Sequence, residues 1–136
     1  MNGVLLDTHT WIWYVNGDTT LKSGAKKRIS EAALNGMLFV SAISTSEVAM
    51  LEAKGRISLT IPTLQWVESA LDCLPIQLSP LTPKITVESC QLLDMHGDPA
   101  DRLIVATARV ENLTLLTRDK NIQKYAKKKH FHVIAV

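Results

Sequence analysis

The stretch VLLDTHT at residues 4–10 decides the fold that we expect for this chain. A short apolar run ends at Asp7, and hydroxyl-bearing residues follow before a helical pattern begins. The run predicts a buried strand over residues 4–6. In an open α/β sheet, functional groups gather beyond the carboxyl ends of the strands. Asp7 lies at such an end, so we expect the other acids of an active site to converge on it.

Strand and helix patterns alternate along the rest of the chain. Short apolar runs predict further strands at residues 37–40, 75–78, 113–116 and 131–136, and helical patterns cover residues 8–15, 23–34, 43–54, 62–71, 82–93, 99–110 and 121–129. This alternation is typical of an α/β fold, in which helices cover both faces of a mostly parallel sheet. No repeat or linker interrupts the chain, which predicts a single domain over residues 1–136.

The composition is that of an ordinary globular protein. Apolar residues make up 46% and charged residues 21%, unlike a disordered chain. A formal net charge of +2 permits a nucleic-acid partner without arguing for one. No signal-peptide pattern opens the sequence, and no apolar run approaches the roughly 20 residues that span a bilayer, so we expect a soluble, cytoplasmic protein. Cys73 and Cys90 follow no metal-ligand spacing, and we expect buried thiols.

Four acids stand out by their places in this pattern. Asp7 and Asp119 follow short apolar strands, whereas Glu47 and Asp101 lie near the starts of two apolar helices. Each acid could instead cap a helix, because residues 44–47 match a capping box and residues 98–101 match an N-cap followed by proline. For any one of these acids taken alone, capping is the more common role.

Taken together, the four acids favour a metal site. The carboxyl ends of parallel strands and the starts of the following helices share one edge of the sheet, so the acids are expected to cluster there. Clustered carboxylates repel one another unless a cation compensates. Magnesium and manganese accept such oxygen ligands, and no His or Cys spacing suggests zinc. An acid-ringed magnesium site suits phosphodiester hydrolysis by a metal-activated water, with one ion or two.

The chain resembles PIN-domain ribonucleases, specifically the VapC-like toxins of bacterial and archaeal toxin–antitoxin pairs. Four motifs in this order carry the resemblance, namely LLDTH at residues 5–9, SAISTSEVAML at 41–51, HGDPADRLIVA at 96–106 and LLTRD at 115–119. The third motif is quite specific, and the four in this order are highly so. The resemblance covers nearly the whole chain.

The resemblance implies a three-layer α/β/α fold and an endoribonuclease that depends on Mg²⁺ or Mn²⁺. Its acidic quartet falls on Asp7, Glu47, Asp101 and Asp119 as metal-holding catalytic residues. Asp98 belongs to the same motif, and we interpret it as the helix cap that aims Asp101. Thr8 and Thr117 match positions where a hydroxyl lies beside the acids and orients them. The resemblance also implies a homodimer, RNA such as tRNA as substrate, and an antitoxin whose tail fills the acidic cleft.

Several other residues keep two interpretations. Trp11, Trp13 and Tyr14 fit a dimer or antitoxin groove as well as simple burial, whereas Trp66 fits the core. The basic cluster, defined by Lys124, Lys127, Lys128 and Lys129, is either a solvated helix face or a phosphate contact. Arg102 and Arg118 could hold phosphate or balance the acids. His9 and His96 flank the motifs, and neither is assigned a catalytic role.

Two rival functions stay open. A phosphatase similar to the haloacid dehalogenase (HAD) family would use Asp7 as its nucleophile, but the position two residues later, where that family has a second aspartate, is His9. No suitably placed lysine follows either. The other rival is a non-catalytic α/β binding module in which all four acids are helix caps.

Overall fold

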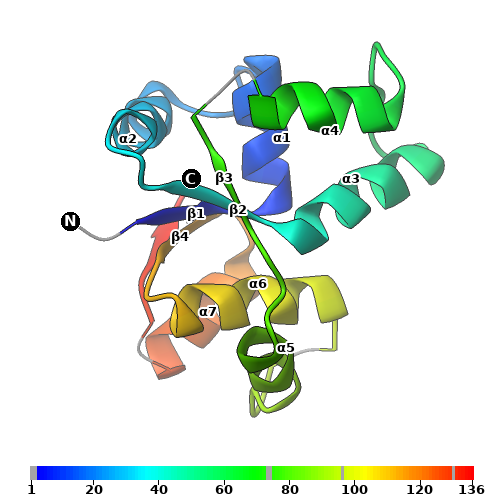
Figure 1. The fold of residues 1–136 in the computed structure, drawn as a ribbon. Coiled ribbons are helices and arrows are strands. Elements are labelled where there is room, and N and C mark those ends of the chain that lie inside the picture. Colours follow the sequence, from blue (N-terminus) through cyan, green and yellow to red (C-terminus); the bar gives the residue numbers. More distant parts are fainter. Residues whose placement is uncertain (1–2, 73–74, 96, 130) are drawn as a thin grey trace.

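A five-stranded parallel sheet forms the centre of the computed structural model, which describes residues 3–72, 75–95, 97–129 and 131–136 (Figure 1). The strands are β1 (Val4–Leu6), β2 (Leu38–Ser41), β3 (Gln77–Ser79), β4 (Thr114–Thr117) and β5 (Val133–Ala135). They lie in the order β3-β2-β1-β4-β5, and each neighbouring pair is parallel. The predicted α/β fold is confirmed, with a fully parallel sheet among the described residues.

Helices cover both faces of this sheet. They are α1 (Thr8–Asn16), α2 (Ser23–Leu34), α3 (Ala42–Ala53), α4 (Thr63–Asp72), α5 (Pro83–Cys90), α6 (Pro99–Val110) and α7 (Lys120–Lys129). Helices α1, α2 and α4 lie on one side of the sheet in Figure 1, and α5, α6 and α7 lie on the other. The three-layer arrangement is therefore confirmed. In the part of the chain that is described, no helix has the length and apolar character needed to cross a membrane.

The short strands are held by apolar side chains on both of their faces. Leu6 and Leu116 point to one side and pack in a core with Trp11, whereas Leu5 and Leu115 point to the other side. All five side chains are fully buried. Because successive side chains of a strand alternate between faces, a central strand covered on both sides is apolar throughout.

Element ends agree with the predicted ends to within three residues. The helix predicted to reach residue 93 ends at Cys90, and the strand predicted over 131–136 is paired only at Val133–Ala135. The Gln91 amide already turns back to the Glu88 carbonyl, and Asp94 has a positive φ of 63°. Helix ends of this kind depend on local hydrogen bonds that hydrophobic periodicity does not report.

Two predictions about single side chains have clear outcomes. Trp66 is buried, and its ring packs edge-on against Trp11 with centroids 5.2 Å apart, which confirms a core role. Cys90 is an exposed free thiol at the end of α5, so the prediction of burial is wrong there. The helix turns its buried face through Ile85 and Ser89, which leaves Cys90 on the solvent side. Cys73 lies outside the described residues.

The strand order places β1 at the point where the connections change direction. From β1 the chain continues to β2 on one side, and β4 lies on the other side. The carboxyl ends of the strands meet on the right of Figure 1, where α3 and α6 begin. In sheets of this kind, ligands bind in the crevice at this reversal.

The buried side chains of the central strands should account for much of the stability. Replacing the fully buried Leu116 with alanine leaves a cavity between sheet and helices, and we expect a loss of about 2–5 kcal/mol in the free energy of unfolding. The matched control is Leu34→Ala at the end of α2, where the side chain is 85% exposed. Urea unfolding should show a change of less than about 0.5 kcal/mol there. Equal losses would contradict the assigned core.

Candidate metal centre

The four predicted acids and Asp98 line one cavity of about 440 Å³ at the carboxyl edge of the sheet. The other lining residues are Thr8, His9, Trp13, Met50, Leu51, Lys54, Arg56, Ile104 and Arg118. A larger cavity of about 550 Å³ lies beside the amino-terminal ends of β1, β2 and β4, and Glu111 is the acid in its described lining. Several acids converge only on the first of these two cavities, which makes it the candidate site.

Asp7 is fixed from two sides. It follows β1 and caps α1, and its Oδ1 accepts a hydrogen bond of 2.9 Å from the Thr10 amide. Its Oδ2 accepts a hydrogen bond from the Thr117 hydroxyl. The same hydroxyl oxygen accepts the Asp119 amide at 3.0 Å. The fully buried Thr117 therefore ties together the acids that follow two neighbouring strands, as predicted for its hydroxyl.

Glu47 reaches the cavity from within α3 and does not cap it. Helix α3 begins at Ala42, and its N-cap is Ser41, whose hydroxyl accepts the Ile43 amide at 3.2 Å. The capping box considered at residues 44–47 is therefore wrong, because the helix begins earlier. The Glu47 carboxylate instead accepts a hydrogen bond from the Thr8 hydroxyl, which confirms the orienting contact predicted for Thr8.

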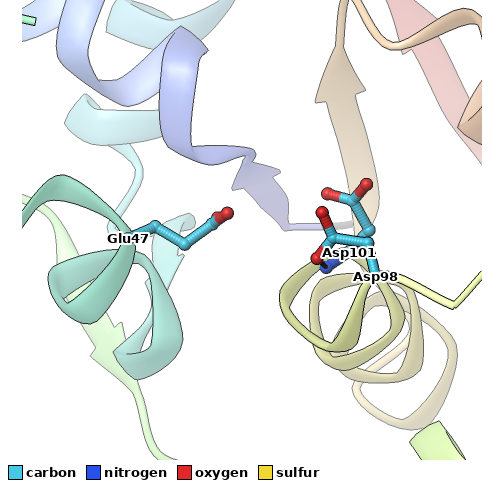
Figure 2. A group of neighbouring side chains, drawn as sticks. All are labelled: Glu47, Asp98 and Asp101. Carbon is cyan, nitrogen blue, oxygen red and sulfur yellow. Dashed lines mark hydrogen bonds between the residues drawn. The ribbon is translucent and has the colours of Figure 1, made fainter. Parts of the chain in front are cut away.

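Asp98 and Asp101 come from the first turn of α6. Asp98 is the N-cap, and its Oδ1 accepts the amides of Ala100 at 3.0 Å and Asp101 at 3.3 Å. Glu47 extends from α3 towards this turn (Figure 2). One carboxylate oxygen each from Glu47, Asp98 and Asp101 lies within 4.8 Å of the other two. Asp7 and Asp119 line the same cavity but lie outside this close group.

Crowding and burial disfavour the charged forms of the central acids. Burial, together with the smaller effects of the nearby charges of Asp98 and Asp119, raises the pKa of Asp101 to about 7. Burial also raises the pKa of Glu47, against the opposing effect of the Thr8 hydrogen bond. The cavity therefore holds carboxylates whose repulsion a bound cation would relieve.

The donor set fits a hard divalent cation. Glu47, Asp98 and Asp101 offer carboxylate oxygens, the ligands that Mg²⁺ and Mn²⁺ prefer. Mg²⁺ keeps several of its waters and needs few carboxylates, so the acids that line this cavity, Asp7 and Asp119 included, would suffice to hold it. The described lining has one histidine, His9, and no cysteine, which does not resemble a zinc site.

Two arginines next to the acids hold the fold around the site. Arg102 donates from Nε, Nη1 and Nη2 to the carbonyls of Ser89, Met95 and Leu92, each at 2.9 Å. These bonds anchor the segment that leads into the cap of α6. Of the two roles predicted for Arg102, these contacts support a structural one.

Arg118 also binds backbone, although it lines the cavity. Its Nε donates to the Val136 carbonyl at 2.9 Å, and Nη2 donates to the Thr20 carbonyl at 3.0 Å. Its guanidinium carbon lies 4.7 Å from the Trp13 ring centroid, a cation–π contact. Arg118 therefore joins the carboxyl end of β4 to α1 and to the end of the chain.

The aromatic residues of α1 divide between core and cavity. Trp11 is fully buried, whereas Trp13 lines the acid cavity, and its ring lies 5.9 Å from that of His9. The Tyr14 hydroxyl lies 3.0 Å from the Ser30 hydroxyl of α2. Trp11 is therefore a core residue, and Trp13 forms part of the cavity wall. His96 lies outside the described residues.

The basic cluster of α7 does not line the cavity of the predicted acids. Lys124 and Lys128 line another cavity, of about 250 Å³, with Asp94 and Met95. The phosphate contact proposed for the basic cluster stays a prediction. Sequence reasoning gave no role to Lys54 and Arg56, which do line the acid cavity. The spacing of Glu47 and Lys54, two helical turns apart on one face, is the pattern that could have indicated Lys54.

The raised pKa of Asp101 predicts that its charge destabilises the metal-free protein. An acid whose pKa rises on folding lowers stability as pH increases from the unfolded to the folded value, here from about 4 to about 7. The gain from Asp101→Asn should therefore grow between these pH values and level off above pH 7. Because solvent screens part of the repulsion, we expect a rise in Tm of about 4 °C at pH 8.

Thermal melts in EDTA across this pH range test the prediction. The matched control is Asp72→Asn at the end of α4, an exposed aspartate outside the cavity. Its Tm difference from the wild type should not grow with pH. A Tm gain that is the same for Asp101→Asn at pH 4 and pH 8 would contradict the electrostatic origin.

Comparisons with known proteins identify the family of the chain and agree with its fold. Residues 4–128 match the family model of the PIN domain. Ribonuclease VapC22 of Mycobacterium tuberculosis is 34% identical over 126 residues, which cover 92% of this chain and 93% of that protein.

Two solved structures share the fold at low sequence identity. VapBC2 from Rickettsia felis, bound to a DNA fragment from its promoter, matches with a TM-score of 0.71 at 15% identity and covers 97% of each chain. DNA-bound VapBC from Salmonella typhimurium matches with a TM-score of 0.72 at 15% identity, over 99% of this chain and 98% of that chain. Because the family model spans nearly the whole chain and a curated relative matches it at 34% identity, the chain belongs to the PIN-domain family.

Proposed function

We propose that this protein is an endoribonuclease that depends on a divalent cation and acts as the toxin of a toxin–antitoxin pair. The observation that carries the proposal is the group of carboxylates of Glu47, Asp98 and Asp101, whose oxygens lie within 4.8 Å of one another in a cavity that Asp7 and Asp119 also line. Membership of the PIN-domain family and the similarity to a protein named as a ribonuclease support it.

We assign the metal-holding catalytic role to Asp7, Glu47, Asp101 and Asp119, with Mg²⁺ or Mn²⁺ as the cation. A bound cation would supply positive charge to the phosphodiester and lower the pKa of a water molecule. The chain's own contribution is to hold the acids in place before the cation arrives. Hydrogen bonds from Thr117 and Thr8 to Asp7 and Glu47 perform this task. Asp98 caps α6 and adds a carboxylate to the same group.

The two rival functions are less well supported. A phosphatase that uses Asp7 as its nucleophile would have a second aspartate two residues later, where this chain has His9, and the family model that matches the chain is that of the PIN domain. The purely capping role fits Asp98, but it does not fit Glu47, which lies in the second turn of α3. Capping by Asp7 leaves its other oxygen facing Thr117, so capping and metal binding are compatible.

The partners are part of the proposal. RNA, including structured RNA such as tRNA, is the expected substrate, and a cognate antitoxin is the expected regulator. A cationic tail suits the acid cavity, because positive charge would relieve the repulsion between the carboxylates there. We also propose a homodimer and a cytoplasmic location, both on the strength of the resemblance to VapC-like toxins.

Cleavage of total bacterial RNA by the purified protein tests the function. We expect discrete fragments with Mg²⁺ or Mn²⁺ and none with EDTA. Asp7→Asn and Asp101→Asn should each lower the cleavage rate by about 10²-fold or more while the fold survives, because each removes a charge from the metal site. Asp72→Asn, outside the cavity, should cleave at the wild-type rate.

A melt in the presence of cation gives a second, independent measurement. Mg²⁺ or Mn²⁺ should raise the Tm of the wild type, because a cation that binds the folded state stabilises it, and the rise should be lost in Asp101→Asn. RNA that stays intact together with a Tm that does not respond to cation would refute the metal site. A covalent phosphate on Asp7 would instead support the phosphatase.

The Thr117 hydroxyl should matter for cleavage through the acids that it orients. Thr117→Val keeps the shape of the side chain but removes the hydrogen bonds to Asp7 and from the Asp119 amide. We expect a loss of about 10-fold to 100-fold in cleavage rate. The matched control is Thr107→Val in α6, also fully buried, whose hydroxyl donates to the Leu103 carbonyl one turn earlier in the same helix. Equal cleavage rates in the two variants would show that the Thr117 hydroxyl does not orient the acids for cleavage.

A further inference from the structure

Helix α3 extends the acid cavity from its acidic end to a cationic end. Glu47, Met50, Leu51 and Lys54 are spaced three, four and seven residues apart, which places them on one face of the helix. All four line the cavity, and Arg56 lines it just beyond the helix. Glu47 and Lys54 lie two turns apart, about 10 Å along the helix axis. Along the cavity, α3 therefore presents an acid from its second turn and a cation from its end.

The end of α3 fixes both cations. Lys54 is the C-cap, and Gly55 follows with a φ of 71°, in the left-handed region that glycine tolerates. The Arg56 amide then bonds back to the Leu51 carbonyl at 2.9 Å. This is the pattern of a Schellman turn, and it holds the backbone of Arg56 against the last turn of the helix. Lys54 and Arg56 are thus presented together by one rigid turn.

These two cations are available to a ligand. Both side chains are exposed, and in the described part of the chain neither forms an ion pair with a carboxylate. On α3, Met50 lies between Glu47 and Lys54 and is 44% exposed, and the partly buried ring of Trp13 lines the same cavity. The cavity therefore offers acids, then an apolar surface, then uncompensated positive charge.

Single-stranded nucleic acid matches this order of surfaces. Its phosphates recur along a flexible strand, and its bases have apolar faces that rest on aromatic and aliphatic side chains. A phosphodiester at the acidic end would need the cation held there, whereas a phosphate farther along the strand would need cations from the chain itself. An acidic protein segment would also bind Lys54 and Arg56, but the acids at the other end would repel it.

We propose that Lys54 and Arg56 bind backbone phosphates of the RNA beside the scissile one, with Met50 and Trp13 against the intervening nucleotide. This inference rests on the proposed ribonuclease function and names the part of the site that holds the substrate strand. Lys54 and Arg56 are substrate-binding residues that hold no metal. Their loss should weaken RNA binding and leave the chemical step intact.

The test compares two double variants with the same change in net charge. The variant Lys54→Gln with Arg56→Gln removes the cationic end, and Lys27→Gln with Arg28→Gln removes two exposed cations of α2 outside the cavity. We expect the first to raise KM for a short single-stranded oligoribonucleotide by about 10-fold with kcat unchanged. The second should leave both constants at their wild-type values, and matching Tm values would show that both variants fold.

Equilibrium binding tests the same contact without cleavage. The oligoribonucleotide is titrated in EDTA with Asp101→Asn protein, with and without each double substitution. Loss of two phosphate contacts should reduce the slope of log Kd against log salt by about 1.4, which is 0.7 for each contact to a single strand. The α2 substitutions should leave the slope unchanged.

The outcomes separate this inference from the proposed function. Equal KM values and equal salt slopes in the two double variants would overturn the role of Lys54 and Arg56, even if the wild type cleaves RNA. A wild type that never cleaves would refute the proposed function, and the binding measurement would still decide whether this turn holds RNA. A loss of cleavage through kcat alone would also overturn the inference, because it would place the cations in the chemical step.

Discussion

Repulsion between carboxylates is the interaction on which this structure depends, because the parallel sheet directs several acids to one edge and the cavity there keeps much of the solvent away. Burial and, to a smaller extent, the neighbouring carboxylates raise the pKa of Asp101 to about 7. A site that gathers acids in this way attracts positive charge, because a cation reduces the repulsion between the carboxylates. A divalent cation or a proton would each reduce that repulsion.

The scaffold withstands the repulsion because the strands behind the site are anchored on both faces. Leu5 and Leu6 point into separate cores on opposite sides of β1, so Asp7 cannot retreat from its neighbours without moving the central strand. Thr117 adds a local constraint, because its buried hydroxyl donates to Asp7 and accepts from the amide of Asp119. The chain's own strands and hydrogen bonds thus fix the positions of these acids, as a preorganised site requires.

Helix capping and metal binding turn out to be compatible uses of the same side chain. A carboxylate has two oxygens, and a cap needs only one of them, as Asp98 shows with Oδ1 bonded to two backbone amides. The amides at a helix start also stabilise negative charge, so a capping acid can stay ionised in crowded surroundings. The spacing of the residues poses capping and metal binding as alternatives. Because each carboxylate has two oxygens, one side chain can do both.

The architecture and the neighbourhood of the acids follow from the sequence alone. Apolar runs that end at Asp7 and shortly before Asp119 locate two strand ends, and the alternation with helices makes the sheet parallel, which brings those ends to one edge. Local patterns were enough here because each depends on residues close together in the chain. They failed for the start of α3 and for Cys90, where the capping residue and the buried face differ from the expected ones.

Only the tertiary structure decided which side chains share the cavity. Glu47 and Asp98 lie on helices far apart in sequence, and their carboxylates approach each other because α3 and α6 face one another across the same edge (Figure 2). Lys54 and Arg56 became part of the site for the same reason, since α3 carries Glu47 on its second turn and Lys54 at its end along one cavity. Hydrophobic periodicity determines which face of a helix is buried, but the direction in which that helix crosses its neighbours depends on packing between distant segments.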